Sequence, residues 1–488
     1  MSAAASYRLT PKQLRILTLI RDYQRKHGYS PTMQELAEVL GVTKVTVFEH
    51  VSGLEKKGLL PNQKTTGTKT TFIGDIKSLT AWSKKPTKDL ILFGPALGAN
   101  SYDQFMAGAF VTNMKFPPPR LQFLLAPMYA TGSKKLTGLG FLYYSFYPDR
   151  LFRKIELGVN GSSFTADTYT DSDNKKVFLG FTKIVPGIKL TLKEKNPRSS
   201  MNRFIQFRSY LISEDGLGFY RDTVISGIDT SINTKYRITD NNRTLNQLRI
   251  VVENNRVLYP YKGELKIEQG KDFLRTAFTG NYFFNYPKKG GLDVRLFAGK
   301  FFYSGAKTFT KQFATDRYHL NMTGANGYED YTYSDYFIGR NKFEGFASQQ
   351  IMVRDGAFKV RTDLLADKVG KNDDWLIAAN FSTTIPDAVN PLAVLPVKIP
   401  LKIFFDLGTQ SEAWKPNAES DRFLFDAGLQ VPLFRETINI YIPLLYSNVY
   451  KEYIQSTIEK KQRFWKKISF SIDISNFSFR KIDRNLNF

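Results

Sequence analysis

Apolar residues near the start of the chain recur every three to four positions, which is the period of an α-helix. A first helix is predicted to begin after Thr10, because Pro11 suits the first helical position and Gln13 can complete a capping box. Gly28 follows a basic last turn and is expected to end this helix. Its predicted apolar face contains Leu14, Leu17 and either Ile20 or Arg21.

Two further helices are predicted, with a tight glycine turn between them. Thr32 and Glu35 repeat the capping box for the second helix, and Gly41 supplies the turn. A third helix starts near Thr43 and ends at Gly58. The apolar faces contain Leu36, Val39 and Leu40 in the second helix, and Val47, Val51 and Leu54 in the third. This order is typical of a helix-turn-helix unit, in which the second helix of the pair enters the major groove of DNA by its N-terminal end.

Residues 1–60 resemble the N-terminal winged-helix domain of the LexA repressor family. The parts that carry the likeness are TPKQ, HGYSPTMQELAE and EHVSGLEKKG. The resemblance implies a small all-α domain that binds double-stranded DNA. It places the base-facing side chains at the start of the third helix, at Thr43, Val45, Thr46, Phe48 and Glu49. Lys44, Lys56 and Lys57 would neutralise phosphates, or they would lie on a solvated helix face.

The sequence departs from the LexA pattern in two places. Pro61 stands where the first strand of the family's basic wing would run, and proline removes a ladder donor. We therefore expect residues 65–72 to form at most a thin hairpin around Gly67. The family's self-cleaving domain has no counterpart, because Ser200–Met201 lacks a partner pattern for a lysine-activated serine. Autoproteolysis and the dimer contacts of that domain are not expected here.

After about residue 90 the period changes to two, as in β-strands. One face of DRFLFDAGLQVPL holds Phe423, Phe425, Ala427, Leu429 and Val431, opposite Asp426, Gly428 and Gln430, with Leu424 as the exception. Similar alternation is found in INIYI, ISFSIDIS, GLDVRLFAGKFFY, RTLNQLRIVVENNRVLYPYKGELKIEQG and MVRDGAFKVRTDLL. Segments of about ten residues, with polar insertions such as YEDYTYSDY between them, are typical of an antiparallel outer-membrane-type β-barrel. A soluble sandwich or propeller is the alternative, since alternation does not reveal which face is buried.

A second resemblance covers the β-rich part. Residues 94–148, with GANSYDQFMAG, FPPPRLQFLLAPMYAT and the GLG before FLYYSFYP, are similar to the barrel region that follows the peptidase domain in large gluzincin-type aminopeptidases. The likeness extends more loosely over residues 90–488. The zinc-binding HExxH helix of that family is absent, so peptidase activity is not expected to carry over. With neither site present, we predict no enzyme, no catalytic residue and no cofactor.

The composition excludes several other sites. The chain has no cysteine and only three histidines, His27, His50 and His319, so thiolate or multi-histidine metal sites are not expected. A formal net charge of +24 is spread along the chain and is compatible with nucleic acid, an anionic membrane or a dispersed basic surface. No apolar run is long enough for a membrane-spanning helix, and the N-terminus lacks the order of a secretory signal.

These patterns predict a multidomain protein. Residues 1–64 form a helix-turn-helix domain, residues 65–90 a linker and residues 91–488 a β-barrel-like domain. The first functional hypothesis is sequence-specific DNA binding, in the cytoplasm, by a protein whose β-domain is non-catalytic. The alternative is an outer-membrane barrel in contact with lipid, whose helix-turn-helix is a chimeric N-terminus. A join between two unrelated genes near residues 60–90 is a third hypothesis, and no small-molecule substrate is identifiable.

Overall fold

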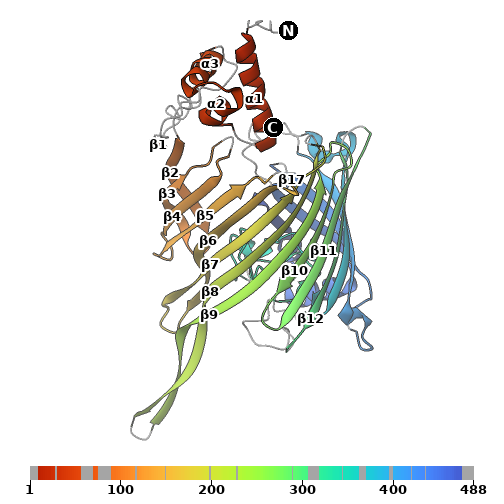
Figure 1. The fold of residues 1–488 in the computed structure, drawn as a ribbon. Helices are drawn as coiled ribbons and strands as arrows, with labels where there is room; N and C mark the ends of the chain where they lie inside the picture. Colours follow the sequence, from red (N-terminus) through yellow and green to blue (C-terminus); the bar gives the residue numbers. More distant parts are fainter. Residues whose placement is uncertain are drawn as a thin grey trace.

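The computed structural model describes residues 9–27, 30–56, 70–74, 89–115, 118–148, 150–196, 199–226, 229–287, 290–305, 318–342, 345–361, 370–394, 399–418, 420–434 and 436–474. In this part of the chain a small helical domain precedes a large β-domain (Figure 1). The helical domain contains α1 (Pro11–His27), α2 (Met33–Leu40) and α3 (Lys44–Lys56). The predicted fold class, an all-α unit followed by an all-β unit, is confirmed.

The predicted capping residues define where α1 and α2 begin. The backbone N–H of Thr10 donates to Gln13 Oε1 at 3.3 Å, and the backbone N–H of Gln13 donates to Thr10 Oγ1 at 3.3 Å. Thr32 and Glu35 exchange the same two bonds, at 2.6 and 3.2 Å. Gly41 ends α2 at a φ of 64°, which is a left-handed conformation that glycine adopts without strain.

One apolar core holds the three helices together. The predicted face of α3 is confirmed, because Val47, Val51 and Leu54 are all buried. Two residues predicted for the other faces are exposed instead, Leu14 at 54% and Val39 at 62%. Since α1 and α2 both pack on α3, the buried stripe of each helix is rotated away from these two positions. The remaining core residues are Ile16, Leu17, Ile20, Met33, Leu36 and Ala37.

Within the described residues, the β-domain has one main sheet of 17 strands. Its strands are β1 (Thr70–Ile73), β2 (Asp89–Asn100), β3 (Gln104–Thr112), β4 (Leu121–Ala130), β5 (Leu136–Phe146), β6 (Phe152–Thr170), β7 (Lys176–Leu192), β8 (Met201–Ser226), β9 (Asp229–Asn254), β10 (Tyr261–Gln269), β11 (Phe273–Asn285), β12 (Gly291–Tyr303), β15 (Trp375–Thr384), β16 (Lys402–Gln410), β17 (Leu424–Leu433), β18 (Ile438–Tyr446) and β19 (Ser469–Ile472). From β2 onwards each strand pairs antiparallel with the next, and β12 pairs with β15.

The sheet curls around a central space and forms a barrel-like wall (Figure 1). No ladder joins β19 to β2 within the residues that the structure describes. The hairpin of β8 and β9, with 26 residues in each strand, projects beyond the rest of the wall (Figure 1). These strands are much longer than the predicted segments of about ten residues.

β1 lies inside the segment that was predicted to be a linker. Thr70–Ile73 pair in parallel with Asp89–Leu92 of β2, so they belong to the β-domain. Residues 57–69, which include Pro61 and the position of the turn expected at Gly67, lie outside the described part of the chain. The end of the segment in which a thin wing hairpin was considered is therefore paired with the barrel wall.

The wall has its apolar side chains on the outside. In β16, Ile403 and Phe405 are 46% and 41% exposed, whereas Asp406 between Phe405 and Leu407 is 0% exposed. In β17, Phe425 is exposed, while Asp426 and the exceptional Leu424 are buried. A soluble sandwich buries the apolar face of each strand, but a membrane barrel exposes it to lipid. The polarity of the wall therefore selects the outer-membrane-type barrel over the soluble alternative.

A lumen segment, residues 318–342, 345–361 and 370–372, fills part of the interior (Figure 1). Its buried side chains include Leu320, Met322, Phe358 and Val360, which join one core with residues of the wall. The strand predicted in MVRDGAFKVRTDLL is wrong for residues 352–361, because Phe358 and Val360 pack inward instead of joining a ladder. The segment contains β13 (Leu320–Asn321), β14 (Lys371–Asn372) and η2 (Phe346–Gln349).

Short helices connect the last strands. Tyr450 and Ile454 of α5 (Asn448–Thr457) are buried in the same core as the lumen segment. None of the helices in the described ranges is both long and apolar enough to cross a membrane. The other helical turns are η3 (Asp387–Val389), η4 (Pro391–Val394), η5 (Ser411–Trp414) and α6 (Arg463–Lys467).

Candidate DNA-binding surface and barrel interior

The first turns of α3 present the side chains that were predicted to face bases. Val45 is 68% exposed and Phe48 is 54% exposed, and Thr43 and Glu49 are exposed as well. Val47 is 0% exposed, because it points into the helical core from the opposite side of α3. The same helix therefore separates a core face from a face that is free to meet a ligand.

Thr43 also determines where α3 begins. Its Oγ1 accepts a hydrogen bond from the backbone N–H of Thr46 at 3.3 Å and lies 2.9 Å from Thr46 Oγ1. Lys44 is exposed, Lys56 is the last residue of α3, and Lys57 lies outside the described residues. Since an N-cap hydroxyl is used by its own helix, the methyl group of Thr43 is the part left for a base.

In the barrel, the GANSYDQ motif is a structural node. Asp103 is 0% exposed and accepts hydrogen bonds from Asn100 Nδ2 at 2.9 Å and Ser133 Oγ at 2.6 Å. It also accepts from the backbone N–H of Thr165 at 2.9 Å and from Thr165 Oγ1 at 2.6 Å. Four donors from three parts of the wall thus meet on one carboxylate. This role was not assigned from the sequence.

The same turn holds the lumen segment. The backbone N–H of Ser101 donates to the carbonyl oxygen of Ile338 at 2.7 Å. Tyr336 Oη donates to the carbonyl oxygen of Ala99 at 2.8 Å, and the backbone N–H of Asn341 donates to Tyr102 Oη at 2.9 Å. The motif that carries the second sequence resemblance is therefore an anchor for the interior.

Buried charges fix the lumen segment to the wall at a second place. Arg275 of β11 is 1% exposed and lies 2.5 Å from Glu268 of β10, and it also forms an ion pair with Asp355 of the lumen segment. Tyr331 Oη of the lumen segment donates to Glu268 Oε2 at 2.7 Å. Breaking one partner out of such a buried network leaves an uncompensated charge, so the network favours one position of the segment.

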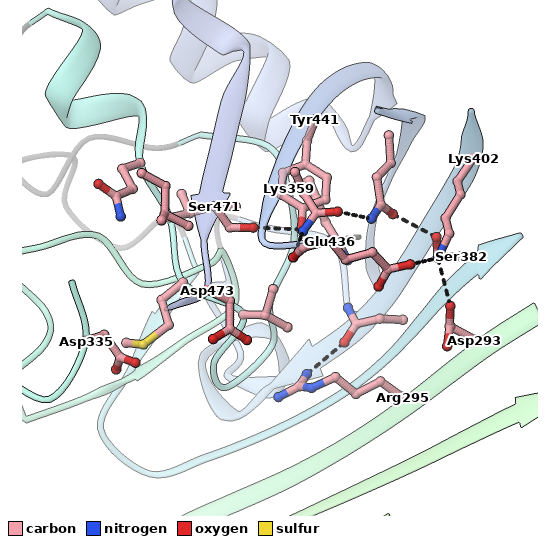
Figure 2. Close-up of a pocket in the computed structure, with 18 of the residues that line it drawn as sticks. Asp293, Arg295, Asp335, Lys359, Ser382, Lys402, Glu436, Tyr441, Ser471 and Asp473 are labelled. Carbon is pink, nitrogen blue, oxygen red and sulfur yellow. Dashed lines mark hydrogen bonds and ion pairs between the residues drawn. The ribbon is translucent and has the colours of Figure 1, made fainter. Parts of the chain in front are cut away.

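A cavity of about 730 Å³ lies between the lumen segment and the wall (Figure 2). Lys402 Nζ is 3.1 Å from Asp293 Oδ2 and 2.5 Å from Glu436 Oε1 at this cavity. Desolvation, and then the negative charge of Asp330, raise the pKa of Asp335, also at the cavity, to about 6. In the described ranges no group of three or more histidine, cysteine or acidic side chains is arranged to hold a metal ion.

Comparison with known families assigns the helical domain. The family model for the LexA DNA binding domain matches residues 6–67. The N-terminal part is a LexA-type DNA-binding domain. The LexA repressor of Acidothermus cellulolyticus is 45% identical over 53 residues, which are 11% of this chain and 19% of that protein. The LexA repressor of Syntrophobacter fumaroxidans is 43% identical over 51 residues, which are 10% of this chain and 25% of that protein.

The LexA-type match thus spans a quarter or less of these two relatives. Among solved structures, BamA from Haemophilus ducreyi matches with a TM-score of 0.37 and 10% identity, covering 82% of this chain and 74% of that one. CdiB from Acinetobacter baumannii matches with a TM-score of 0.34 and 11% identity, covering 74% of this chain and 56% of that one. Because these values are low, the barrel assignment rests on the strand pairing and the polarity of the wall.

The candidate functional residues of the LexA-type domain were predicted from the sequence, whereas the buried polar residues of the barrel were not. Around α3 the structure brings together Thr43, Lys44, Val45 and Thr46 on consecutive positions, with Phe48 and Glu49 in the next turn. In the barrel, the buried polar residues lie on the polar faces of alternating strands, as Asp426 does. Once the polar face is known to be the inner one, a position on it marks a residue as a candidate for an interior role.

Proposed function

We propose that the LexA-type domain binds double-stranded DNA in a sequence-specific manner through the N-terminal half of α3. The supporting observation is the division of α3 into two faces, with Val47 buried while Val45 and Phe48 are exposed. Val45 and Phe48 are three positions apart and so share one face of the helix, where a single partner can cover both. The edge of a thymine, with its C5-methyl group, is such a partner in the major groove.

Each predicted contact has a distinct chemical role in this proposal. The methyl groups of Thr43 and Val45 contact thymine, and Phe48 adds apolar area beside them. Glu49 accepts from the amino group of cytosine, and the Thr46 hydroxyl contacts a base edge. Lys44, together with Lys56 at the end of α3 and Lys57 next to it in the sequence, neutralises phosphates and sets the position of the domain without selecting sequence.

The test begins with selection of duplexes from a random pool by the full chain in detergent micelles. The selected duplex is then bound by Glu49→Ala, Lys44→Ala and the control Leu14→Ala, which changes an exposed residue of α1. Glu49→Ala is expected to weaken binding by about 1–3 kcal/mol and to relax selectivity at one base pair. Lys44→Ala should weaken all sequences alike and reduce the salt slope by about one.

Two outcomes contradict the DNA proposal. Selection that yields no shared sequence would leave only phosphate binding, which is independent of sequence. An equal loss of affinity in Leu14→Ala and Glu49→Ala would place the contact surface elsewhere on the domain. We expect the protein to retard the duplex in a gel, with an affinity that falls as the salt concentration rises. Leu14→Ala should bind with the affinity of the parent.

We propose further that the β-domain is a non-catalytic barrel whose outer face contacts membrane lipid. The supporting observation is the inverted polarity of the wall, with Phe405 exposed and Asp406 buried in neighbouring positions. The buried charges of Arg275, Glu268 and Asp355 hold the lumen segment in place, which is a structural role and not a catalytic one. The expected result is a detergent-requiring, heat-modifiable species that inserts into lipid vesicles, and a water-soluble monomer without detergent would overturn the proposal.

The origin of the two parts forms a separate proposal. The proposal that residues 94–148 derive from the barrel region of gluzincin-type aminopeptidases is supported by the sequence likeness of the GANSYDQ motif and its neighbouring segments. Under the alternative function, the LexA-type domain is a foreign N-terminus on such a barrel. Reading the source DNA across the codons for residues 58–95 tests this, because a single uninterrupted gene contradicts a join between two genes.

A further inference from the structure

Two acidic residues face each other in the interior of the wall. Asp406 of β16 and Asp426 of β17 are direct partners in the antiparallel ladder, and both are 0% exposed. Directly opposite residues of an antiparallel pair have Cβ atoms about 4.5–5.5 Å apart, so the two carboxylates are close neighbours. Two buried carboxylates at this separation repel each other when both are charged.

Each carboxylate uses one oxygen to hold the lumen segment. Asp426 Oδ2 accepts from the backbone N–H of Lys359 at 3.0 Å and from that of Val360 at 2.7 Å. Asp406 Oδ1 accepts from Lys359 Nζ at 2.7 Å and from Asn380 Nδ2 at 2.9 Å. The pair therefore binds both the backbone and the side chain of Lys359.

The other two oxygens have no donor from the described residues. Asp406 Oδ2 and Asp426 Oδ1 are both buried without a hydrogen-bond partner. An unpaired buried acceptor is unfavourable, and more so when it is charged. We propose that a single proton is bound between Asp406 Oδ2 and Asp426 Oδ1, and that this proton holds the lumen segment against the wall.

Each of the other polar groups that face the pair within the described residues either has a partner of its own or lies beyond hydrogen-bond distance of the two unpaired oxygens. Arg295 of β12 directs Nη1 to the carbonyl oxygen of Asp355 and to Asn380 Oδ1, both at 2.8 Å. Tyr441 of β18 is hydrogen-bonded to Ser471 Oγ at 3.2 Å. The other groups that face the pair are the ammonium of Lys359 and the buried hydroxyl of Tyr450 on α5, which has no partner among the described residues.

In this proposal, loss of the bound proton releases the lumen segment from the wall. With the proton in place, the pair carries one negative charge, which the ammonium of Lys359 balances. When the proton leaves to solvent base, a second carboxylate charge appears, and within the described part of the chain no second cation forms an ion pair with the two carboxylates. Repulsion between the two carboxylates then weakens the four hydrogen bonds to Lys359, Val360 and Asn380.

The chain has no cysteine, so a single introduced thiol reports on the contact. Val360→Cys places the reporter at a side chain that is 0% exposed, and Val257→Cys, at 92% exposure, corrects for the effect of pH on thiol reactivity. The full chain in detergent micelles is labelled with a maleimide at about pH 7 and about pH 10, around the ordinary thiol pKa. Asp426→Asn is the decisive background, because its amide supplies a permanent N–H to Asp406.

We expect the corrected labelling of Val360→Cys to rise by at least about tenfold between the two pH values. The reason is that an uncompensated buried charge strongly destabilises the contact in which it appears. In the Asp426→Asn background labelling should stay low at both values. A second reporter, Ser469→Cys, is near-isosteric and sits where Ser469 Oγ donates to the carbonyl oxygen of Lys359 at 2.6 Å. It guards against failure of the first variant to fold and should respond in the same way.

Three outcomes overturn the proposal. Equal responses with Asp426 and with Asp426→Asn would mean that no shared proton controls the contact. High labelling of Asp426→Asn at about pH 7 would mean that the charge of Asp426 is itself required. Protection at high pH that depends on added sodium or calcium chloride, relative to choline chloride, would assign the site to a metal cation.

Discussion

The LexA-type domain and the barrel wall put their apolar side chains on opposite sides. In α3, Val47 and Leu54 are 0% exposed, and apart from Val45 and Phe48 the exposed side chains are polar. In the wall, Ile377 and Ile403 are 51% and 46% exposed, while Asp406 and Asp426 are 0% exposed. Apolar groups avoid water in the helical domain by packing in a protein core, and under the proposed function those of the wall avoid it by contacting lipid.

The two regions also differ in how their interiors are held. The helical core is apolar, so its stability comes mainly from burial and packing. The barrel interior combines an apolar core with ion pairs such as Arg275 to Glu268 and Lys359 to Asp406. Such contacts need specific geometry, and removal of one partner is costly, so they specify where the lumen segment lies.

The largest effect is expected from removing packing in the small helical core. Leu54→Ala should lower the free energy of unfolding of this domain by about 2–5 kcal/mol, because it leaves a cavity at a fully buried position. Leu14→Ala, at an exposed position, should stay within about 0.5 kcal/mol. Urea unfolding followed by far-ultraviolet circular dichroism of the helical signal measures both. Similar losses in the two variants would contradict the assigned core.

The next largest effect is expected from placing a charge on the outer face of the wall. Phe405→Lys places a charge where lipid is expected and should destabilise the barrel by about 2–4 kcal/mol if the residue lies near the bilayer midplane. Val39→Lys, at an exposed position of α2, should change stability by about 0.5 kcal/mol or less. Folding equilibria in lipid vesicles, followed by electrophoretic mobility, test this. A barrel that tolerates Phe405→Lys as α2 tolerates Val39→Lys is not embedded in lipid at that strand.

A smaller effect concerns the node at Asp103. Asp103→Asn keeps the shape of the side chain but removes its charge. The amide N–H of the asparagine then faces other donors, such as the backbone N–H of Thr165, and cannot accept from them. We expect a loss of about 1.5–3 kcal/mol, the range for hydrogen bonds to charged groups. Thermal unfolding in detergent measures it, with Asp173→Asn on an exposed turn as the control. Unchanged unfolding would mean that Asp103 does not hold the surrounding hairpins together.

The smallest effect is a dependence on pH at the cavity. The pKa of Asp335 is raised from 3.8 to about 6, so this group favours the folded state while it is protonated. Its contribution is present below its ordinary pKa and is lost as the pH rises towards about 6. Because Asp335 is exposed to the cavity, the change should be below about 1 kcal/mol. Stability of Asp335→Asn should vary less across this range than that of the parent, and an unaltered profile would contradict the shift.

Local sequence signals predicted much of the fold. The capping boxes at Thr10 and Thr32 and the turn at Gly41 all lie where their residue types indicated, because these interactions involve neighbours only a few positions apart. GLDVRLFAGKFFY coincides with β12 (Gly291–Tyr303). Exposure of Leu14 and Val39 was not predicted, since the helical stripe that becomes buried depends on how α1 and α2 pack on α3.

The sequence predicted which residues form the candidate DNA-binding surface. That this surface binds DNA stays a prediction. Exposure of Val45 and Phe48 follows from the core position of Val47, which helical spacing already indicated. The interior of the barrel was not predictable in the same way. Asp406 and Asp426 are 20 positions apart and reach Lys359 through bonds that span 47 and 67 residues. No local pattern records contacts at that separation.

The sequence by itself determined the helices, their caps, the alternation of the strands and the absence of thiol chemistry, because each depends on residue type and short-range spacing. Only the tertiary structure decided that the polar face of the wall is the inner one, that MVRDGAFK folds into the lumen, and that Thr70–Ile73 join the β-domain. Alternation is symmetric between two faces, and the choice between them is made when the sheet curls and one face becomes enclosed.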